Sequence, residues 1–231
     1  MRIAAPFAVV TAAGFLSLTG GCQSSQPSAS ASAHPLGFDP VVAFKPGLRS
    51  ELLAMRQEDQ ALRAKISQTP ESERRALFVT ILENNDENIE RLEEIINRYG
   101  WPTISMVGKD GAEAAWLIAQ HADQRPDFRE RCLGLMQQAA DNGEASKAHL
   151  AYLVDRVMVE ISQEQLYGTQ FWDGPNGYGP VPIIDETNVD LRRTVAGLVT
   201  MEDYTLAMES RRPGAALDEQ ATASVELDDD Q

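Results

Sequence analysis

The side chains with the clearest chemical potential lie between residues 101 and 170. His121 could act as the general base of a hydrolase, because an imidazole exchanges protons near neutral pH. A general base of this kind needs a carboxylate to orient its ring, and Asp155 and Asp123 are the candidates. The candidate catalytic residues are therefore His121, Asp123 and Asp155.

The same stretch could instead line a binding pocket. Its aromatic, amide, hydroxyl and charged groups are the types that fix the orientation of a small molecule or a peptide. The candidate ligand-binding residues are Trp116, Gln120, His121, Asp155, Arg156, Tyr167, Thr169 and Gln170. A third alternative stays open, in which these groups only join the helices to a hairpin through internal hydrogen bonds.

Recognised catalytic spacings are missing from the sequence. It contains no serine-hydrolase elbow, phosphate-binding glycine loop, dinucleotide fingerprint or zinc-binding HExxH motif. Within the predicted domain the histidines are His121 and His149, and the pattern places His149 on a solvated helix face. A zinc site would rest on one histidine and carboxylates, so we predict neither a metal nor a cofactor. The sequence therefore favours binding over catalysis.

The acidic composition narrows the choice of partners. The 231 residues carry a formal charge of −15, with 35 acidic against 20 basic side chains. Such a surface repels the phosphates of nucleic acid. We therefore expect no nucleic-acid partner.

The N-terminal residues are typical of an export signal. Residues 1–21 contain one basic side chain, Arg2, and then an apolar run that is too short for a membrane span. The run ends in Leu18-Thr19-Gly20-Gly21-Cys22, which resembles the lipobox of bacterial lipoproteins, although Thr19 replaces the usual aliphatic residue. This resemblance implies lipidation of Cys22 and a membrane-anchored lipoprotein that faces the periplasm or the cell exterior. An ordinary secretory signal is the alternative.

Three segments follow the leader. Residues 22–37 contain the lipidated cysteine and a Ser/Ala/Pro-rich tether without an apolar period, which predicts flexibility. Residues 38–210 carry the periodic apolar residues of one helical domain. Residues 211–231 hold six acidic side chains, which predicts a disordered acidic tail.

Two amphipathic helices open the predicted domain. Over residues 50–67 apolar side chains recur at spacings of three and four, and Asp59 lies on that apolar stripe, where it should point at a partner. Thr69-Pro70-Glu71 is the start signal of a second helix. Three asparagines, at 84, 85 and 88, interrupt its apolar stripe. Either this helix breaks near Asp86 or the asparagines face a partner inside the fold, and we favour the break.

Three further helices follow. The helix predicted over 111–122 is apolar around nearly its whole circumference, which is typical of a buried helix. Gln120 and His121 should therefore lie in the interior and have partners. Another helix is expected over 127–142, with Cys132 as a small buried thiol.

The helix expected over 146–162 has apolar stripes on two sides, so Asp155 and Arg156 should be partly enclosed. An enclosed charge without a partner is strongly unfavourable. The pairings that we expect are Asp155 with His121, and Arg156 with Asp123 or Asp59.

The C-terminal part predicts a small hairpin and two short helices. Residues 167–172 alternate, and residues 181–184 could return as an edge strand after a turn. Thr187-x-x-Asp190 and Thr200-x-x-Asp203 resemble capping boxes for a helix over 188–196 and a last short helix. The expected fold class is all-α: a single domain of about six to seven helices with a small β-hairpin near residues 166–184.

Six short motifs are spaced through the predicted domain: Glu58-Asp59-Gln60, Trp101-Pro102, Ala114-Ala115-Trp116, Gln120-His121-Ala122-Asp123, Ala151-Tyr152-Leu153-x-Asp155-Arg156 and Tyr167-Gly168-Thr169-Gln170. Together they resemble an uncharacterised bacterial family that is catalogued only as a domain of unknown function. The likeness covers about residues 48–204. It implies one whole domain with a lipoprotein leader added, and it implies no activity, substrate or cofactor.

The sequence thus predicts a lipid-anchored cell-envelope protein that acts as a binding or interaction module. Its expected partners are the membrane, through Cys22, and a small molecule or peptide. The alternative is an envelope hydrolase that uses His121 as general base with Asp155 or Asp123.

Overall fold

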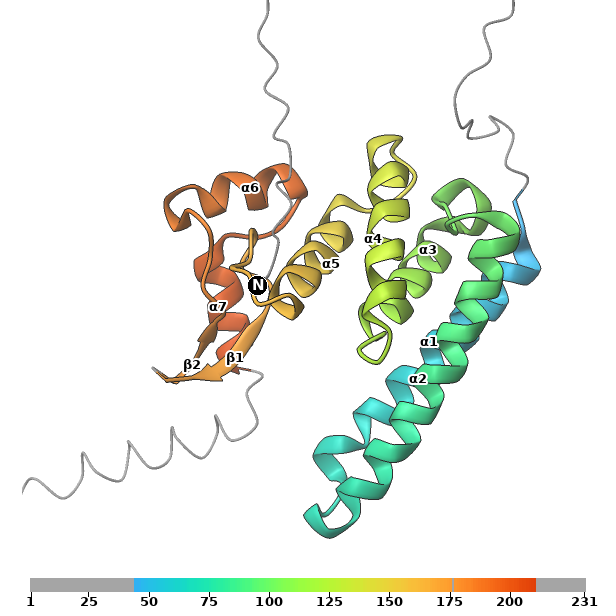
Figure 1. Ribbon diagram of the computed structural model, residues 1–231, viewed down its shortest axis with the longest axis horizontal. Coiled ribbons are helices and arrows are strands. Elements are labelled where there is room, and N and C mark those ends of the chain that lie inside the picture. Colours follow the sequence, from blue (N-terminus) through green and yellow to red (C-terminus); the bar gives the residue numbers. More distant parts are fainter. Residues whose placement is uncertain (1–43, 176, 211–231) are drawn as a thin grey trace, which may run out of the picture. The chain divides into compact units, whose positions relative to one another are not determined.

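The computed structural model of the protein describes residues 44–175 and 177–210. Within them, seven α-helices and a two-stranded antiparallel hairpin confirm the predicted fold class (Figure 1). The predicted leader, Cys22, the tether and the acidic tail lie outside the described residues. The elements are α1 (Pro46–Ala64), a 3-10 turn (Ile66–Gln68), α2 (Glu71–Tyr99), α3 (Ile104–Gln120), α4 (Pro126–Asp141), α5 (Lys147–Glu160), β1 (Phe171–Gly174), β2 (Gly177–Pro180), a second 3-10 turn (Glu186–Asn188), α6 (Val189–Ala196) and α7 (Met201–Ser210).

Helices α1 to α5 enclose the main hydrophobic core. Helix α1 packs along both α2 and α3, and α4 packs against α5. The buried side chains come from every one of these helices, because each presents an apolar stripe to the others. Those with no more than 1% of their surface exposed include Leu52, Leu92, Val107, Phe128, Cys132, Met136 and Leu153. Among the described helices none is long and apolar enough to cross a bilayer.

Helix α2 is continuous, so the predicted break near Asp86 is wrong. All three asparagines of its inner face are buried. They remain in the helix because their amides have partners: Asn88 Nδ2 donates to Asn84 Oδ1 at 3.0 Å, and Asn85 Oδ1 accepts from Arg63 Nη2 at 3.0 Å. The structure shows the other alternative, in which the asparagines face partners inside the fold.

Helix α3 begins seven residues earlier than Gly111, where the sequence pattern places its start. Thr103 caps the new start by accepting the backbone N–H of Met106 at 3.3 Å. The helix is kinked at Gly108, which has a φ of +76°. A non-glycine residue would be strained in this left-handed conformation.

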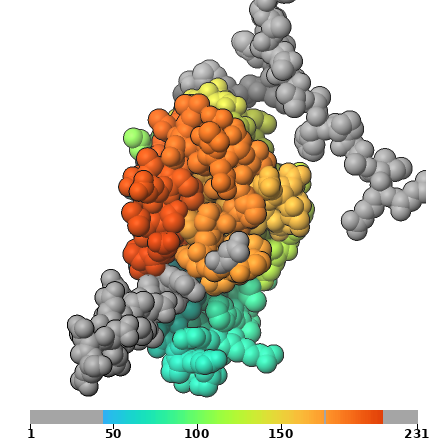
Figure 2. All heavy atoms as spheres, turned by 90° about the vertical axis from the view of Figure 1, so that its left-hand side faces the viewer, coloured from blue at the N-terminus to red at the C-terminus, as the bar shows by residue number. Residues whose placement is uncertain are grey.

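The C-terminal elements pack beside α5. In the space-filling view the residues coloured orange and red, from the hairpin to α7, form most of the visible face (Figure 2). The hairpin is shorter than predicted and its strands lie nearer the turn: β1 shares only residues 171–172 with the predicted strand 167–172, and β2 ends before the predicted strand 181–184. The reason is that the N–H groups of Leu166, Tyr167, Thr169 and Gln170 donate to the buried side chains of Asp155 and Gln165 instead of to a neighbouring strand.

One of the two predicted capping boxes forms. The N–H of Asp203 donates to Thr200 Oγ1 at 3.2 Å at the start of α7. The box predicted at Thr187 does not form, because Asp190 Oδ1 accepts the N–H of Met201 at 2.7 Å. Asp190 therefore joins α6 to α7 rather than capping α6.

Candidate functional site

A buried carboxylate and a histidine form the centre of the site. Asp59 lies on the inner face of α1 and is 3% exposed. His121 is the residue that ends α3, and its side chain is 20% exposed. Its Nδ1 lies 3.1 Å from Asp59 Oδ1 and 3.0 Å from Oδ2. Asp59 lies on the apolar stripe of α1, and its side chain faces inward, as the sequence predicts.

Asp59 is held in its charged form. Burial raises the pKa of this carboxyl, but hydrogen bonds from His121 and Gln60 and the positive charge of Arg63 outweigh burial, so the pKa lies below its ordinary value. Gln60 Nε2 donates to Oδ2 at 2.8 Å and Arg63 Nε donates to Oδ1 at 2.9 Å. A carboxylate only accepts, so Nδ1 of His121 must donate to it. In the neutral ring Nε2 is then left as the acceptor.

Two amide side chains are joined to this pair by hydrogen bonds, Gln60 directly and Asn85 through Arg63. Arg63 connects Asp59 to Asn85, because its Nη2 donates to the amide oxygen of Asn85. Gln120, next to His121 in the chain, is 9% exposed, and its Oε1 is buried without a hydrogen-bond partner in the described part of the protein. An unpaired buried carbonyl costs about 1–3 kcal/mol, so it calls for an explanation. Asp59, Gln60, Arg63, Asn85 and His121, which these hydrogen bonds join, are called the His121 cluster below, together with Gln120, the chain neighbour of His121.

A second charged network begins two residues after His121. Asp123 Oδ1 accepts from both Arg129 Nη2 and Arg156 Nη2, each at 2.7 Å. The predicted pairing of Arg156 with Asp123 is confirmed. Arg129 is 2% exposed and also donates to Glu160 at 2.9 Å. Asp123 therefore bonds two guanidinium groups through one oxygen, and it bonds them rather than the ring of His121.

Asp155 does not contact His121, so the predicted pairing of these two residues is wrong. Its oxygens accept the backbone N–H groups of Leu166 at 2.8 Å, Tyr167 at 3.0 Å and Thr169 at 2.9 Å. They also accept the Thr169 hydroxyl at 2.9 Å. The loop after α5 folds back over the helix, and its donors converge on this carboxylate. Asp155 therefore organises the loop, and the predicted orientation of a general base by Asp155 does not occur.

The other predicted ligand-binding residues are dispersed. Gln170 Oε1 accepts from Arg156 Nη1 at 3.3 Å, and its amide nitrogen donates to the Thr169 hydroxyl at 3.0 Å. Trp116 stacks on His149 with ring centroids 4.1 Å apart. The prediction of a solvated His149 is therefore wrong, and burial lowers its pKa below the ordinary value. These residues do not converge on one pocket with His121.

Two cavities lie between the described helices, and neither is lined by a residue of the His121 cluster. One, of about 390 Å³, lies between α4, α5 and α6 and has Tyr167 in its wall. The other, of about 370 Å³, lies between α3, α4 and α5 and has His149 in its wall. No group of three or more His, Cys, Asp or Glu side chains within the described ranges is placed to hold a metal ion.

Residues 46–213 match the model of a protein family, described as "Family of unknown function (DUF6624)". The chain belongs to this family. The match extends across α1 to α7, so the His121 cluster and the Asp155 loop both belong to the DUF6624 domain. The resemblance deduced from the six spaced motifs is thereby confirmed. No curated protein and no solved structure matches the chain.

Within this DUF6624 domain, sequence reasoning missed the residues that complete the cluster. Asp59, Arg63 and Asn85 are absent from the predicted site. A signal for them was present, because Asp59 and the asparagines each interrupt an apolar stripe. A charged or amide side chain on a buried face costs free energy unless it is paired. Two such interruptions on neighbouring helices therefore indicated a shared polar site.

Proposed function

We propose that this protein is a cell-envelope binding protein whose site is the His121 cluster. The observation that carries the proposal is the pair of acceptors at the end of α3. Gln120 Oε1 is buried without a partner, and Asp59 directs the second ring nitrogen of His121 away from itself. A ligand that presents an N–H donor, such as a small amide or amine, would satisfy either acceptor. The proposal extends to Cys22 as a lipid anchor that holds the domain at the membrane.

A binding experiment tests the site. We would record ¹H–¹⁵N spectra of the protein with acetamide, N-acetylalaninamide and ethylamine as probes. The expected result is a saturable shift of residues in the His121 cluster, weakened at least tenfold by His121→Ala. The matched control is His149→Ala, which removes the other histidine of the described residues and should leave binding unchanged. Shifts that are the same in His121→Ala and in the unaltered protein would refute the site.

Labelling with an alkyne analogue of palmitate tests the anchor separately. Expression in a bacterial host should give a labelled protein in the membrane fraction. Cys22→Ala should remove the label and Cys132→Ala should retain it, because Cys132 is buried in the core. An unlabelled protein that is released from the membrane would favour the ordinary secretory signal.

Hydrolysis is the second candidate function, and one observation favours it. The contact of Nδ1 with Asp59 is the geometry that orients a general base, leaving Nε2 to take a proton from water. Asp59 therefore replaces Asp155 and Asp123 as the orienting carboxylate of this hypothesis. p-Nitrophenyl acetate and an alanine p-nitroanilide are suitable first substrates. Turnover lost in both His121→Ala and Asp59→Asn, but retained in His149→Ala, would establish the activity.

A further inference from the structure

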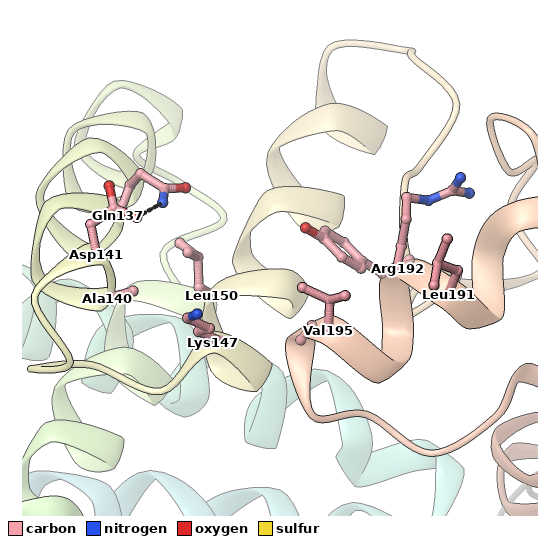
Figure 3. Close-up of a pocket in the computed structure, with 10 residues that line it drawn as sticks. Gln137, Ala140, Asp141, Lys147, Leu150, Leu191, Arg192 and Val195 are labelled. Carbon is pink, nitrogen blue, oxygen red and sulfur yellow. Dashed lines mark hydrogen bonds between the residues drawn. The ribbon is translucent and has the colours of Figure 1, made fainter. Parts of the chain in front are cut away.

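The groove between α4, α5 and α6 is distinct from the His121 cluster. Its volume is about 390 Å³, which falls in the range of small-molecule sites. In Figure 3, Ala140, Lys147 and Leu150 lie on one side, and Leu191, Arg192 and Val195 lie on the other. None of the His121 cluster residues lines it. Whatever occupies the groove would therefore bind independently of His121.

Half of the residues that line the groove are aliphatic. Ala140, Leu150 and Ala196 line it and are buried, whereas Leu191 is 66% exposed and Val195 is 70% exposed. These two residues are one turn apart on α6, so they present one apolar ridge to the groove. Exposed aliphatic side chains beside a concave surface are a typical feature of an apolar-ligand site.

Tyr167 brings a hydroxyl group to the groove. Its backbone is fixed on both sides, because its N–H donates to Asp155 and its carbonyl accepts from Arg193. The side chain lines the groove, and its hydroxyl has no hydrogen-bond partner among the described residues. Burial and the charge of Asp155 raise the pKa of the phenol, so it remains a donor at neutral pH.

The charges at the rim are mainly positive. Lys147, the first residue of α5, lines the groove and has no ion pair within the described part of the chain. The guanidinium of Arg192 donates to the backbone carbonyl of Leu166 at 2.7 Å, and the nearest carboxylate oxygen that pairs with it, Asp185 Oδ2, is 3.7 Å away. Asp141 is the single acidic residue of the lining, and it accepts from Gln137 at 2.9 Å.

We propose that this groove binds a single-chain amphiphile, with its aliphatic chain along Leu150, Leu191 and Val195 and an anionic head near Lys147 and the Tyr167 hydroxyl. The volume admits one such chain, whereas a protein helix about 10 Å across would need a longer and wider groove. An unpaired ammonium group and a phenol donor together recognise a carboxylate or a phosphate.

Methyl NMR of the full chain, made by cell-free synthesis without detergent or lipid, tests this proposal. Decanoate is the main probe, and decyltrimethylammonium carries the opposite charge on a similar chain. We expect decanoate to shift the methyl signals of Leu150, Leu191 and Val195 saturably. Its dissociation constant should be at least fivefold lower than that of decyltrimethylammonium, and Lys147→Gln should remove this preference.

Two variants separate the groove from general apolar adsorption. Val195→Asp should weaken decanoate binding at least tenfold. The matched control is Leu206→Asp, which makes the same change at a 60% exposed leucine of α7 outside the groove and should leave binding unchanged. Equal weakening by the two variants would overturn the proposal.

Other outcomes identify which part of the proposal fails. Equal affinity for both amphiphiles would refute the proposed preference for an anionic head group. Methyl shifts that depend on protein concentration alone would show that a second copy of the chain occupies the groove, and they would refute the amphiphile as its ligand. None of these results bears on the binding of amides by the His121 cluster, which the His121→Ala comparison decides separately.

Discussion

Replacement of Asp155 by alanine should destabilise the domain strongly without altering His121. Asp155 is 0% exposed, and its carboxylate accepts from the three backbone N–H groups and one hydroxyl of the loop that follows α5. Alanine would leave all four donors without their acceptor. Two of them belong to Thr169, which is 4% exposed and has little access to replacement water.

The size of the effect follows from these donors. A buried donor left without a partner costs about 1–3 kcal/mol, so the two groups of Thr169 alone predict a loss of about 2–6 kcal/mol. The donors of Leu166 and Tyr167 are partly exposed and should regain water, adding little. We expect a loss of ~3–5 kcal/mol, which is a large part of the ~5–15 kcal/mol that stabilises a typical domain.

Urea unfolding followed by far-ultraviolet circular dichroism measures this loss. The matched control is Asp141→Ala, an exposed aspartate with one side-chain hydrogen bond, which should change stability by at most about 0.5 kcal/mol. Hydrogen exchange should show the amides of residues 166–169 losing protection in Asp155→Ala. The NMR signals of the His121 ring should stay unchanged. A loss below about 1 kcal/mol with full amide protection would refute the proposed role of Asp155.

Three further predictions concern the cluster, the core and the kink of α3. The pKa of Asp59 is lowered in the folded protein, so its contribution to stability should be full above the unfolded value of 3.8 and be lost as pH falls through the folded pKa. The free energies of unfolding of the protein and of Asp59→Asn, measured in urea, should therefore converge at acid pH. A difference that persists or grows there would contradict this prediction. Burial raises the pKa of the Cys132 thiol to about 12, so its reaction with Ellman's reagent at pH 8 should be slow in the native protein and fast in urea, whereas equal rates would contradict its place in the core. Gly108→Ala should cost at least about 1 kcal/mol, because a φ of +76° disfavours alanine and its Cβ would lie 3.1 Å from Asp110 Oδ1; Gly134→Ala is the control, since nothing lies within 4 Å of that added Cβ.

The sequence alone showed that the fold is helical and where most helices lie, because the spacing of apolar residues reports the helical period. It also determined that Asp59 faces inward and that Cys132 is buried, since each position lies on a stripe that must pack against another helix. The same periodicity could not decide whether the three asparagines of α2 end a helix or belong to a polar site. The answer depended on Arg63, which belongs to a different helix, α1, and donates a hydrogen bond to the amide oxygen of Asn85.

Only the tertiary structure decided which carboxylate meets His121. The sequence suggests His121 as a general base oriented by Asp155 or Asp123, yet the three side chains bond to different partners. His121 bonds Asp59 of α1, Asp123 bonds the two arginines of α4 and α5, and Asp155 bonds the loop before β1. Side-chain partners depend on the direction in which each chain segment leaves its helix, and no local pattern encodes that direction. The groove beside Tyr167 has the same origin, because its two walls come from helices about 40 residues apart that only the folded chain brings together.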